Sequence, residues 1–147
     1  MTRRVECQAG IYHWWCLARY ASDYAGEFDR PKIVYQEITT HQSFAYDDSG
    51  AYANNKVFII PDADLALLGV LNSSAVWEWL TANCPPLSGG ALAMQRPFLS
   101  RVPVPAMSDS DRSILRVLVQ KCLDARGVGC EEWEKEIDER VEALYGL

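Results

Sequence analysis

The chain has 147 residues, enough for one domain with a small appendage, and 49% of them are apolar, which supplies a substantial core. This composition excludes intrinsic disorder, and no apolar run approaches the roughly 20 residues that a membrane-spanning helix needs. The net charge of −6, from 14 basic and 20 acidic residues, argues against DNA binding when the chain is taken as a whole. The acidity is uneven, however, because residues 107–147 hold six basic and ten acidic residues while the stretch between Glu78 and Asp109 holds no acid.

The cysteines and the first residues bear on the compartment. Five cysteines occur without any Cys-x-x-Cys spacing, and an odd number does not suit a disulfide framework or a zinc site. Residues 1–6 include two arginines but no apolar stretch follows them, which does not fit a secretory signal. We therefore expect a cytoplasmic protein with reduced thiols, no metal and no membrane contact.

The front of the chain predicts short strands after one short helix. Tyr20, Tyr24 and Phe28 lie at helical spacing and predict a helix that ends before Pro31. Residues 32–38 are β-branched and short, which is typical of a strand, and residues 44–46 and 51–60 predict two more. Because Asp47-Asp48-Ser49-Gly50 has turn composition, we expect the last two strands to form a hairpin.

Two helices and an extended segment should follow. Residues 61–64 open a helix with aspartates that can cap its free amides, and the helix is interrupted at Asn72-Ser73-Ser74. A second helix should end at Cys84-Pro85-Pro86. Residues 87–90 then predict a flexible loop, and residues 91–102 predict extended structure broken by Pro97. Residues 102–105 alternate valine and proline, which imposes an extended linker.

The tail predicts an antiparallel pair of helices. Ser108 can cap the first helix with Asp111 at the capping-box position, and the glycines at 127 and 129 should end it. Apolar residues recur on one face of each helix: Ile114, Leu118 and Cys122 on the first; Trp133, Ile137, Val141 and Leu144 on the second. The predicted fold class is α+β, with a small mixed or antiparallel sheet and packed helices in residues 1–106 and a helical hairpin in residues 107–147.

Catalytic constellations are missing from the sequence. The spacing of His13, His41 and the cysteines does not favour a nucleophile–base pair, and the paired aspartates are explained by a turn and a helix cap. The glycine pair Gly89-Gly90 lacks the spacing that cradles phosphates. We therefore expect no catalysis by this chain alone.

Several motifs in fixed order carry a family resemblance. They include residues 31–38, 44–47, 54–61 and 67–73, the Ser88-Gly89-Gly90 turn, and Arg101-Val102-Pro103-Val104-Pro105. In this order the chain resembles the TaqI-like C-terminal specificity domain of adenine-specific DNA methyltransferases and fused restriction–modification enzymes. Residues 14–17 are similar to the family's entry to that domain, and residues 136–147 to its closing helix.

The resemblance implies a DNA target recognition domain. Its partners would be double-stranded DNA and a methyltransferase catalytic domain, in cis or in trans, which would hold S-adenosylmethionine. This sequence contains neither a glycine-rich cofactor loop nor an Asn-Pro-Pro-Tyr motif, so we expect no cofactor on this chain and interpret it as a fragment or a solitary specificity domain. Ser88 stands where many relatives carry arginine.

Candidate DNA contacts follow from side-chain chemistry, since Asn and Gln suit adenine edges and Arg suits guanine. We expect base contacts from polar residues on the loops: His41, Gln42, Asn54, Asn55, Gln95 and Arg96. Lys32, Lys56 and Arg101 are better suited to phosphates. The Ser88-Gly89-Gly90 turn should face DNA, because it lies in the acid-free stretch and its glycines permit close backbone approach.

Other interpretations remain open at this point. Asn54 and Asn55 could satisfy backbone groups in their own turn, and one of Trp77 and Trp79 should lie in the core while the other covers a partner. The alternative function is a protein–protein interaction module that uses the acidic helical tail and exposed aromatic residues. A strong salt dependence of DNA binding would separate the two functions.

Overall fold

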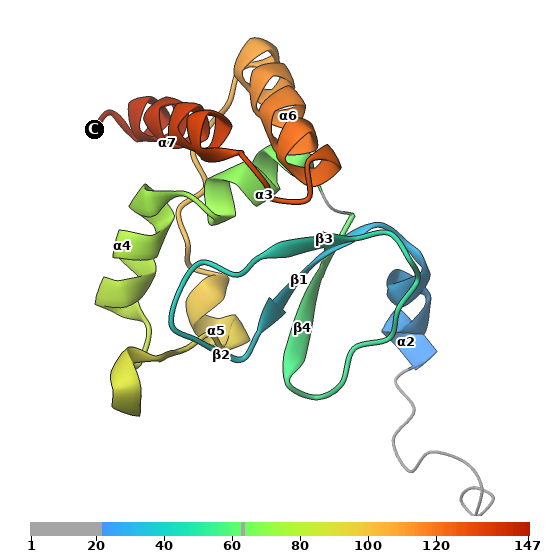
Figure 1. Cartoon of the computed structure of the whole chain (residues 1–147). Coiled ribbons are helices and arrows are strands. Elements are labelled where there is room, and N and C mark those ends of the chain that lie inside the picture. Colours follow the sequence, from blue (N-terminus) through green and yellow to red (C-terminus); the bar gives the residue numbers. More distant parts are fainter. Residues whose placement is uncertain (1–21, 63) are drawn as a thin grey trace, which may run out of the picture.

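A three-stranded antiparallel sheet lies at the centre of the computed structural model, which describes residues 22–62 and 64–147 (Figure 1). Its order is β3-β1-β4, with β1 spanning Lys32–Gln36, β3 Ala45–Asp47 and β4 Val57–Pro61. Ile33 of β1 lies opposite Tyr46 on one side and Ile60 on the other. A second, two-stranded ladder pairs β2 (Ile38–Thr39) with β5 (Leu92–Ala93).

The predicted hairpin is wrong. Strands β3 and β4 both pair with β1 rather than with each other, and residues 51–56 are a loop instead of the start of a strand. The Asp47 side chain accepts hydrogen bonds from the Ser49 amide and hydroxyl, at 3.1 and 2.6 Å, so the turn chemistry is real. The turn carries the chain past the end of β1. Ile33 of β1, the central strand of the sheet, is fully buried.

The helices after the sheet begin and end where the sequence predicts. Helix α3 spans Leu65–Leu71, and the Asp64 carboxylate accepts the Ala66 amide at 3.0 Å. Helix α4 spans Ser74–Asn83, is capped by the Ser73 hydroxyl and ends at Cys84. Before the sheet, α2 (Ser22–Ala25) and the 3-10 helix η1 (Gly26–Asp29) correspond to the predicted aromatic helix, whose Tyr20 lies outside the described residues.

The segment from 91 to 102 is only partly extended. After the 3-10 turn η2 (Ser88–Gly90) and β5, residues Arg96–Leu99 form the short helix α5, so the prediction of a wholly extended stretch is wrong. Pro97 sits in the first turn of α5, where its missing N–H is not needed and its fixed φ favours the helix. The proline that suggested a break instead starts a helical turn.

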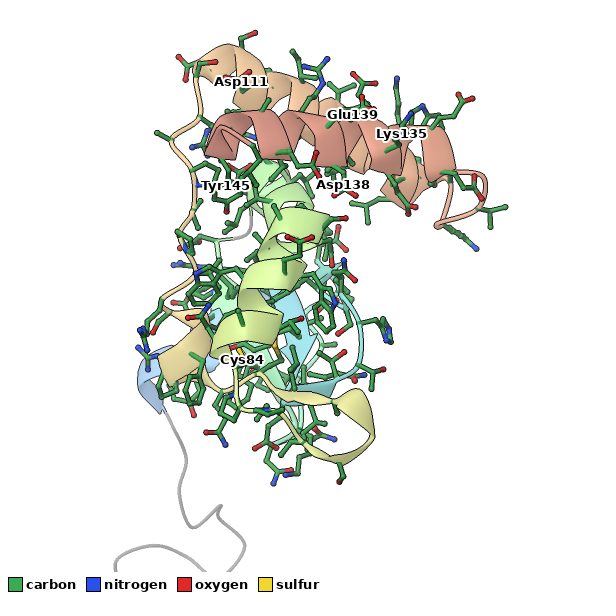
Figure 2. The ribbon with its side chains drawn as sticks, turned by 90° about the vertical axis from the view of Figure 1, so that its left-hand side faces the viewer. Cys84, Asp111, Lys135, Asp138, Glu139 and Tyr145 are labelled. Carbon is green, nitrogen blue, oxygen red and sulfur yellow. The ribbon has the colours of Figure 1, made fainter. Side chains whose placement is uncertain are left out.

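The tail forms the two predicted helices, α6 (Asp109–Asp124) and α7 (Glu131–Tyr145). Ser108 and Asp111 form the expected capping box, with the Ser108 hydroxyl accepting the Asp111 amide at 3.1 Å. In Figure 2, α7 runs back across α6 toward the residue labelled Tyr145. Both helices pack against α3 at the end of the molecule away from the strand tips.

One apolar cluster joins the sheet, α3, α4 and the tail helices. Its fully buried members come from both predicted segments, including Ile33, Leu80, Met94, Leu115 and Val141. Trp77 and Trp79 are both partly buried against it, so neither is wholly free for a partner. The boundary predicted at residue 106 stays a prediction. No helix in the described part of the chain is long and apolar enough to cross a membrane.

Candidate nucleic-acid interface

Three segments that are distant in sequence meet at the end of the molecule opposite α6 and α7 (Figure 1). The Glu37 amide donates to the Lys56 carbonyl at 2.9 Å, and the Met94 amide donates to the Glu37 carbonyl at 2.7 Å. Ile38 lies directly opposite Ala93 in the β2–β5 ladder. We call residues 36–41, 54–56 and 88–96 the recognition edge, because they contain most of the candidate DNA contacts.

Gln95 and Arg96 lie at the start of α5 with their side chains exposed. The Gln95 side chain occupies the N-cap position but forms no capping hydrogen bond, which leaves its amide available. Burial raises the pKa of Tyr35, and the positive charge of nearby Arg96 opposes that rise. The Arg96 guanidinium therefore lies near Tyr35 of β1 while it remains accessible to solvent.

Lys56 is the other cation of the recognition edge. Its Nζ lies 2.7 Å from the Glu37 carboxylate, with 66% of the lysine side chain exposed. The Asn54 side chain accepts the Lys56 amide at 2.9 Å, so this asparagine does satisfy its own turn, as the local interpretation predicts. Asn55 beside it is exposed. An exposed ion pair of this kind is weak and can be exchanged for a phosphate.

The Ser88–Gly90 turn is exposed and open. Gly89 and Gly90 both have φ of +76°, in the left-handed region that favours glycine. A Cβ atom built on either glycine would meet nothing within 4 Å, so the space above the turn is free. The Leu87 amide donates to the Ala91 carbonyl at 2.7 Å and closes the turn beside β5.

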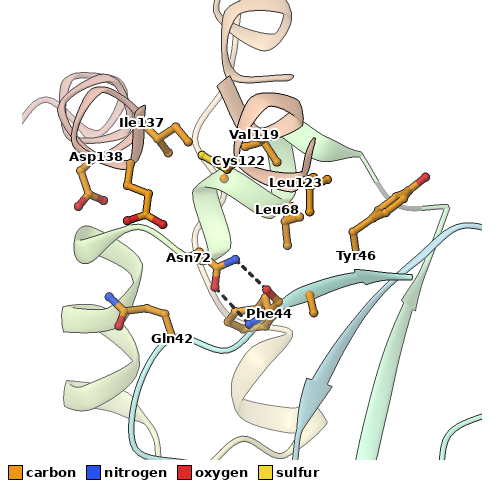
Figure 3. Close-up of a pocket in the computed structure, with 13 residues that line it drawn as sticks. Gln42, Phe44, Tyr46, Leu68, Asn72, Val119, Cys122, Leu123, Ile137 and Asp138 are labelled. Atoms are coloured by element: carbon orange, nitrogen blue, oxygen red, sulfur yellow. Dashed lines mark hydrogen bonds between the residues drawn. The ribbon is translucent and has the colours of Figure 1, made fainter. Parts of the chain in front are cut away.

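His41 and Gln42 separate although they are adjacent in sequence. His41 is exposed after β2, with its Nδ1 3.3 Å from the Thr40 hydroxyl. Gln42 instead lines a groove of about 560 Å³ that also contains the acidic residues Glu134 and Asp138 (Figure 3). These carboxylates would repel DNA phosphates, so the surroundings of Gln42 do not favour the DNA contact that we expected there.

Lys32 is not a phosphate contact, and that prediction is wrong. Its side chain is fully buried, its Nζ lies 2.5 Å from the Asp47 carboxylate, and it donates to the Phe28 carbonyl at 2.8 Å. The hydrogen bond from Lys32, together with that from Ser49, lowers the pKa of Asp47 to about 2. Asp47 thereby compensates the buried ammonium of Lys32, which would be costly to leave without a carboxylate.

Arg101 is exposed just beyond α5 and is not joined to the recognition edge by the backbone bonds that define it. From there the chain leads away toward α7, where the Tyr145 hydroxyl donates to the Pro103 carbonyl at 2.5 Å. Its expected phosphate contact stays a prediction.

The groove near Gln42 lies between the 42–46 segment, α3 and the two tail helices. The Asn72 side chain braces one wall, since it accepts the Phe44 amide at 3.1 Å and donates to the Phe44 carbonyl at 2.9 Å (Figure 3). Asp138 accepts the Ser74 amide and hydroxyl at 2.9 and 2.8 Å and thereby ties α7 to the start of α4. The groove has an apolar floor and an acidic rim.

Catalytic chemistry finds no support in the described residues. Burial raises the pKa of Cys84, whose position at the end of α4 is marked in Figure 2, and burial with the neighbouring Cys130 raises that of Cys122 to about 11. Both are thus held as thiols rather than nucleophilic thiolates. Within residues 22–62 and 64–147, no three potential metal ligands cluster.

Ile38 was not among the candidate contacts. The strand predicted over 32–38 is interrupted at Glu37, and 50% of the Ile38 side chain is exposed within the recognition edge. The available signal was the polar pair Gln36-Glu37, which interrupts the apolar run.

Comparison with known proteins identifies the family to which this part of the chain belongs. No curated protein matches the chain. The model of the family described as TaqI-like C-terminal specificity domain matches residues 8–104, which include the whole recognition edge and end just before α6. The match confirms the resemblance over residues 8–104, while the expected similarity of residues 136–147 to the closing helix stays a prediction. The chain belongs to the family of TaqI-like C-terminal specificity domains.

Proposed function

We propose that the recognition edge binds double-stranded DNA and selects its sequence on behalf of an adenine-specific DNA methyltransferase or restriction–modification enzyme. The observation that carries this proposal is that Lys56, Gln95, Arg96 and the open glycine turn are all exposed on segments that backbone hydrogen bonds join at one end of the molecule. Family membership supports the same role in target recognition.

The side chains supply both kinds of DNA contact. The Gln95 amide can donate to and accept from the adenine edge, and Arg96 can bind a guanine edge or a phosphate. Lys56 can exchange Glu37 for a phosphate, and the backbone of Gly89 and Gly90 can approach a phosphate closely because no side chain intervenes. The acid-free sequence from residue 79 to 108 reduces repulsion at this surface.

Methyl transfer then belongs to a separate catalytic domain, in the same chain or another, that holds S-adenosylmethionine. On this proposal the 147 residues bind no cofactor by themselves. Calorimetry with S-adenosylmethionine should give no binding heat, and a saturable micromolar affinity would contradict that part of the proposal.

A second function is favoured by one observation, the groove with its apolar floor and its acidic rim of Glu134 and Asp138. Such a surface suits a basic, amphipathic segment of a partner protein, since a long cationic side chain can lay its methylenes on the floor and its charge on the rim. Exposed Tyr24 and Tyr52 add aromatic surface elsewhere. On this alternative DNA plays no part.

A titration with mixed-sequence duplex DNA at low and moderate salt separates the two functions. DNA recognition predicts an affinity that falls steeply as salt rises, because phosphate contacts release counterions. Arg96→Ala and Lys56→Ala should each weaken binding and reduce the salt dependence, whereas Glu132→Gln on α7 should not weaken it. Absence of salt-dependent binding would favour the protein-interaction alternative.

A further inference from the structure

We propose that the β2–β5 ladder enters the major groove as a two-stranded ribbon, and that Ile38 and Gln95 on its exposed face together recognise an A·T base pair. This inference rests on the proposed DNA-binding function and names what that surface recognises. It assigns to Ile38 a role that the sequence analysis did not foresee.

The two faces of the ladder differ sharply in burial. Thr39, Leu92 and Met94 are 6%, 4% and 1% exposed, so this face of the ladder belongs to the core. Ile38 is 50% exposed, and Gln95 is exposed as well. Because side chains of a strand alternate between faces, Ala93 and Gln95 lie on the outer face with Ile38.

The register brings the outer side chains together. Ile38 lies opposite Ala93, and the hydrogen bond from the Met94 amide to the Glu37 carbonyl continues the same ladder by one step. Gln95 then lies opposite exposed Gln36 and diagonal to Ile38, within reach of side chains across an antiparallel pair. Ala93, which lies opposite Ile38 and two residues before Gln95, has only a methyl side chain and leaves this diagonal open.

This pair of side chains matches the major-groove edge of an A·T pair. Adenine presents an acceptor and a donor that a glutamine amide can bind at two points, and the thymine of the same pair presents an apolar methyl group. A G·C pair has neither that donor–acceptor order nor a methyl group. The major groove is wide enough to admit a two-stranded ribbon, whereas the minor groove is not.

The flanking charges are suited to hold the ribbon in the groove. Lys56 lies beside the residue that precedes β2, and Arg96 follows shortly after β5, so the antiparallel pairing places both cations toward the same end of the ladder, where they can bind the phosphates of one stretch of DNA. Glu37, the acid next to Ile38 in the chain, alternates to the other face of the ladder and is paired with Lys56. Half of the Ile38 side chain is exposed among these polar groups, and no other side chain in the described residues covers that half.

The test begins with selection of binding sites by the full chain from a randomised library of double-stranded DNA. Each thymine in the selected duplex is then replaced by uracil, which removes only the methyl group. We expect replacement at one position to weaken wild-type binding about fourfold, as for one buried methyl-sized group. Ile38→Ala should bind the thymine and uracil duplexes equally, and Gln95→Ala should lose preference for adenine at that pair by at least about fivefold. Val117→Ala, an exposed apolar truncation on α6, is the matched control and should behave as wild type.

The outcomes separate this inference from the function on which it rests. Selection of no sequence, with no salt-dependent binding, would overturn both. A clear selected sequence whose recognition is insensitive to every thymine replacement, or an Ile38→Ala variant that retains the thymine preference, would overturn the ribbon inference and leave DNA recognition in place. Melting curves of the variants should match that of wild type, because both side chains are exposed.

Discussion

The two ends of this molecule are built on different principles. At the helical end, α3, α6 and α7 bury Leu115 and Val141 completely, and a capping box fixes the start of α6. At the recognition edge, the strands of the ladder have two residues each, the glycine turn is open, and Ile38, Gln95 and Arg96 are exposed although Leu92 and Met94 are buried. One core joins the two ends, but the recognition edge leaves more of its side chains exposed and able to contact a ligand.

The charge follows the same division. Helix α7 carries most of the acids of the tail and pairs some of them within the helix, as in Lys135–Glu139 and Arg140–Glu136 (both pairs on exposed turns; Figure 2 marks Lys135 and Glu139). In the recognition edge, the acidic residue Glu37 forms an ion pair with Lys56. A net charge of −6 is therefore misleading as a guide to DNA binding in this chain, because the surface proposed to meet DNA is not the surface that carries the acids.

The largest effect should come from the core of the helical end. Leu115→Ala removes a fully buried side chain where α6 packs on α3, and it should lower the free energy of unfolding by about 2–5 kcal/mol. Urea denaturation would measure the loss. Val117→Ala, two positions along the same helix and 55% exposed, should change stability by less than about 0.5 kcal/mol. Equal losses in the two variants would show that α6 does not pack as described.

A smaller effect should come from the ion pair inside the sheet. Asp47→Asn leaves the ammonium of buried Lys32 without its carboxylate and should cost about 2 kcal/mol, the value of a hydrogen bond to a charged group. The pKa of Asp47 in the folded protein is about 2, below the ordinary 3.8. Its stabilising effect is therefore complete above pH 4 and is lost as the pH falls from about 4 toward 2.

Acid denaturation measures this pH dependence directly. The wild-type protein should lose stability over that interval more steeply than Asp47→Asn, which has no carboxylate to protonate there. Parallel curves would mean that Asp47 is not coupled to folding. Asp48→Asn, which changes the neighbouring carboxylate, is the matched control and should leave the wild-type slope unchanged.

The capping box should contribute about 1 kcal/mol. Ser108→Ala removes the hydroxyl that accepts the Asp111 amide and should lower stability by that amount, while Ser108→Asp should retain most of it. Thermal melting of the two variants provides the comparison. If Ser108→Ala melted at the same temperature as the wild type, the start of α6 would be held by packing alone.

The smallest stability effect should come from the recognition edge itself. Lys56→Ala breaks an exposed ion pair and should leave the melting temperature nearly unchanged, yet it should weaken DNA binding and reduce its salt dependence by about one phosphate contact. Differential scanning and a salt titration on the same preparation would show both. A variant that melts early but binds DNA normally would reverse the roles assigned to the two ends.

Local signals made much of this fold predictable. The caps predicted at residues 61–64 and at Ser108 stand at the observed helix starts, because each needs only a polar side chain and its neighbouring amides. The hairpin failed because Asp47-Asp48-Ser49-Gly50 specifies a turn but not the strand with which the chain pairs afterwards. Pro97 misled for a related reason, since proline is unfavourable inside a helix but favourable in its first turn.

The candidate site was only partly accessible to sequence reasoning. Gln95, Arg96 and Lys56 were identified from side-chain chemistry, and the backbone bonds through Glu37 that join them depend on tertiary pairing. Lys32 was misjudged because its burial beside Asp47 depends on tertiary packing, whereas the contact expected of Gln42 stays a prediction. Ile38 was missed because an isoleucine in a strand is normally core.

The central claim is that DNA meets the recognition edge and not the helical end, and amide chemical shifts measured during titration of the full chain with duplex DNA test it most directly. The account predicts salt-sensitive shifts at Ile38, Lys56, Gly90 and Gln95, with the amides of α7 from Glu131 to Tyr145 unmoved. Shifts confined to α7 or to the groove at Glu134 and Asp138, with none at the edge, would contradict it.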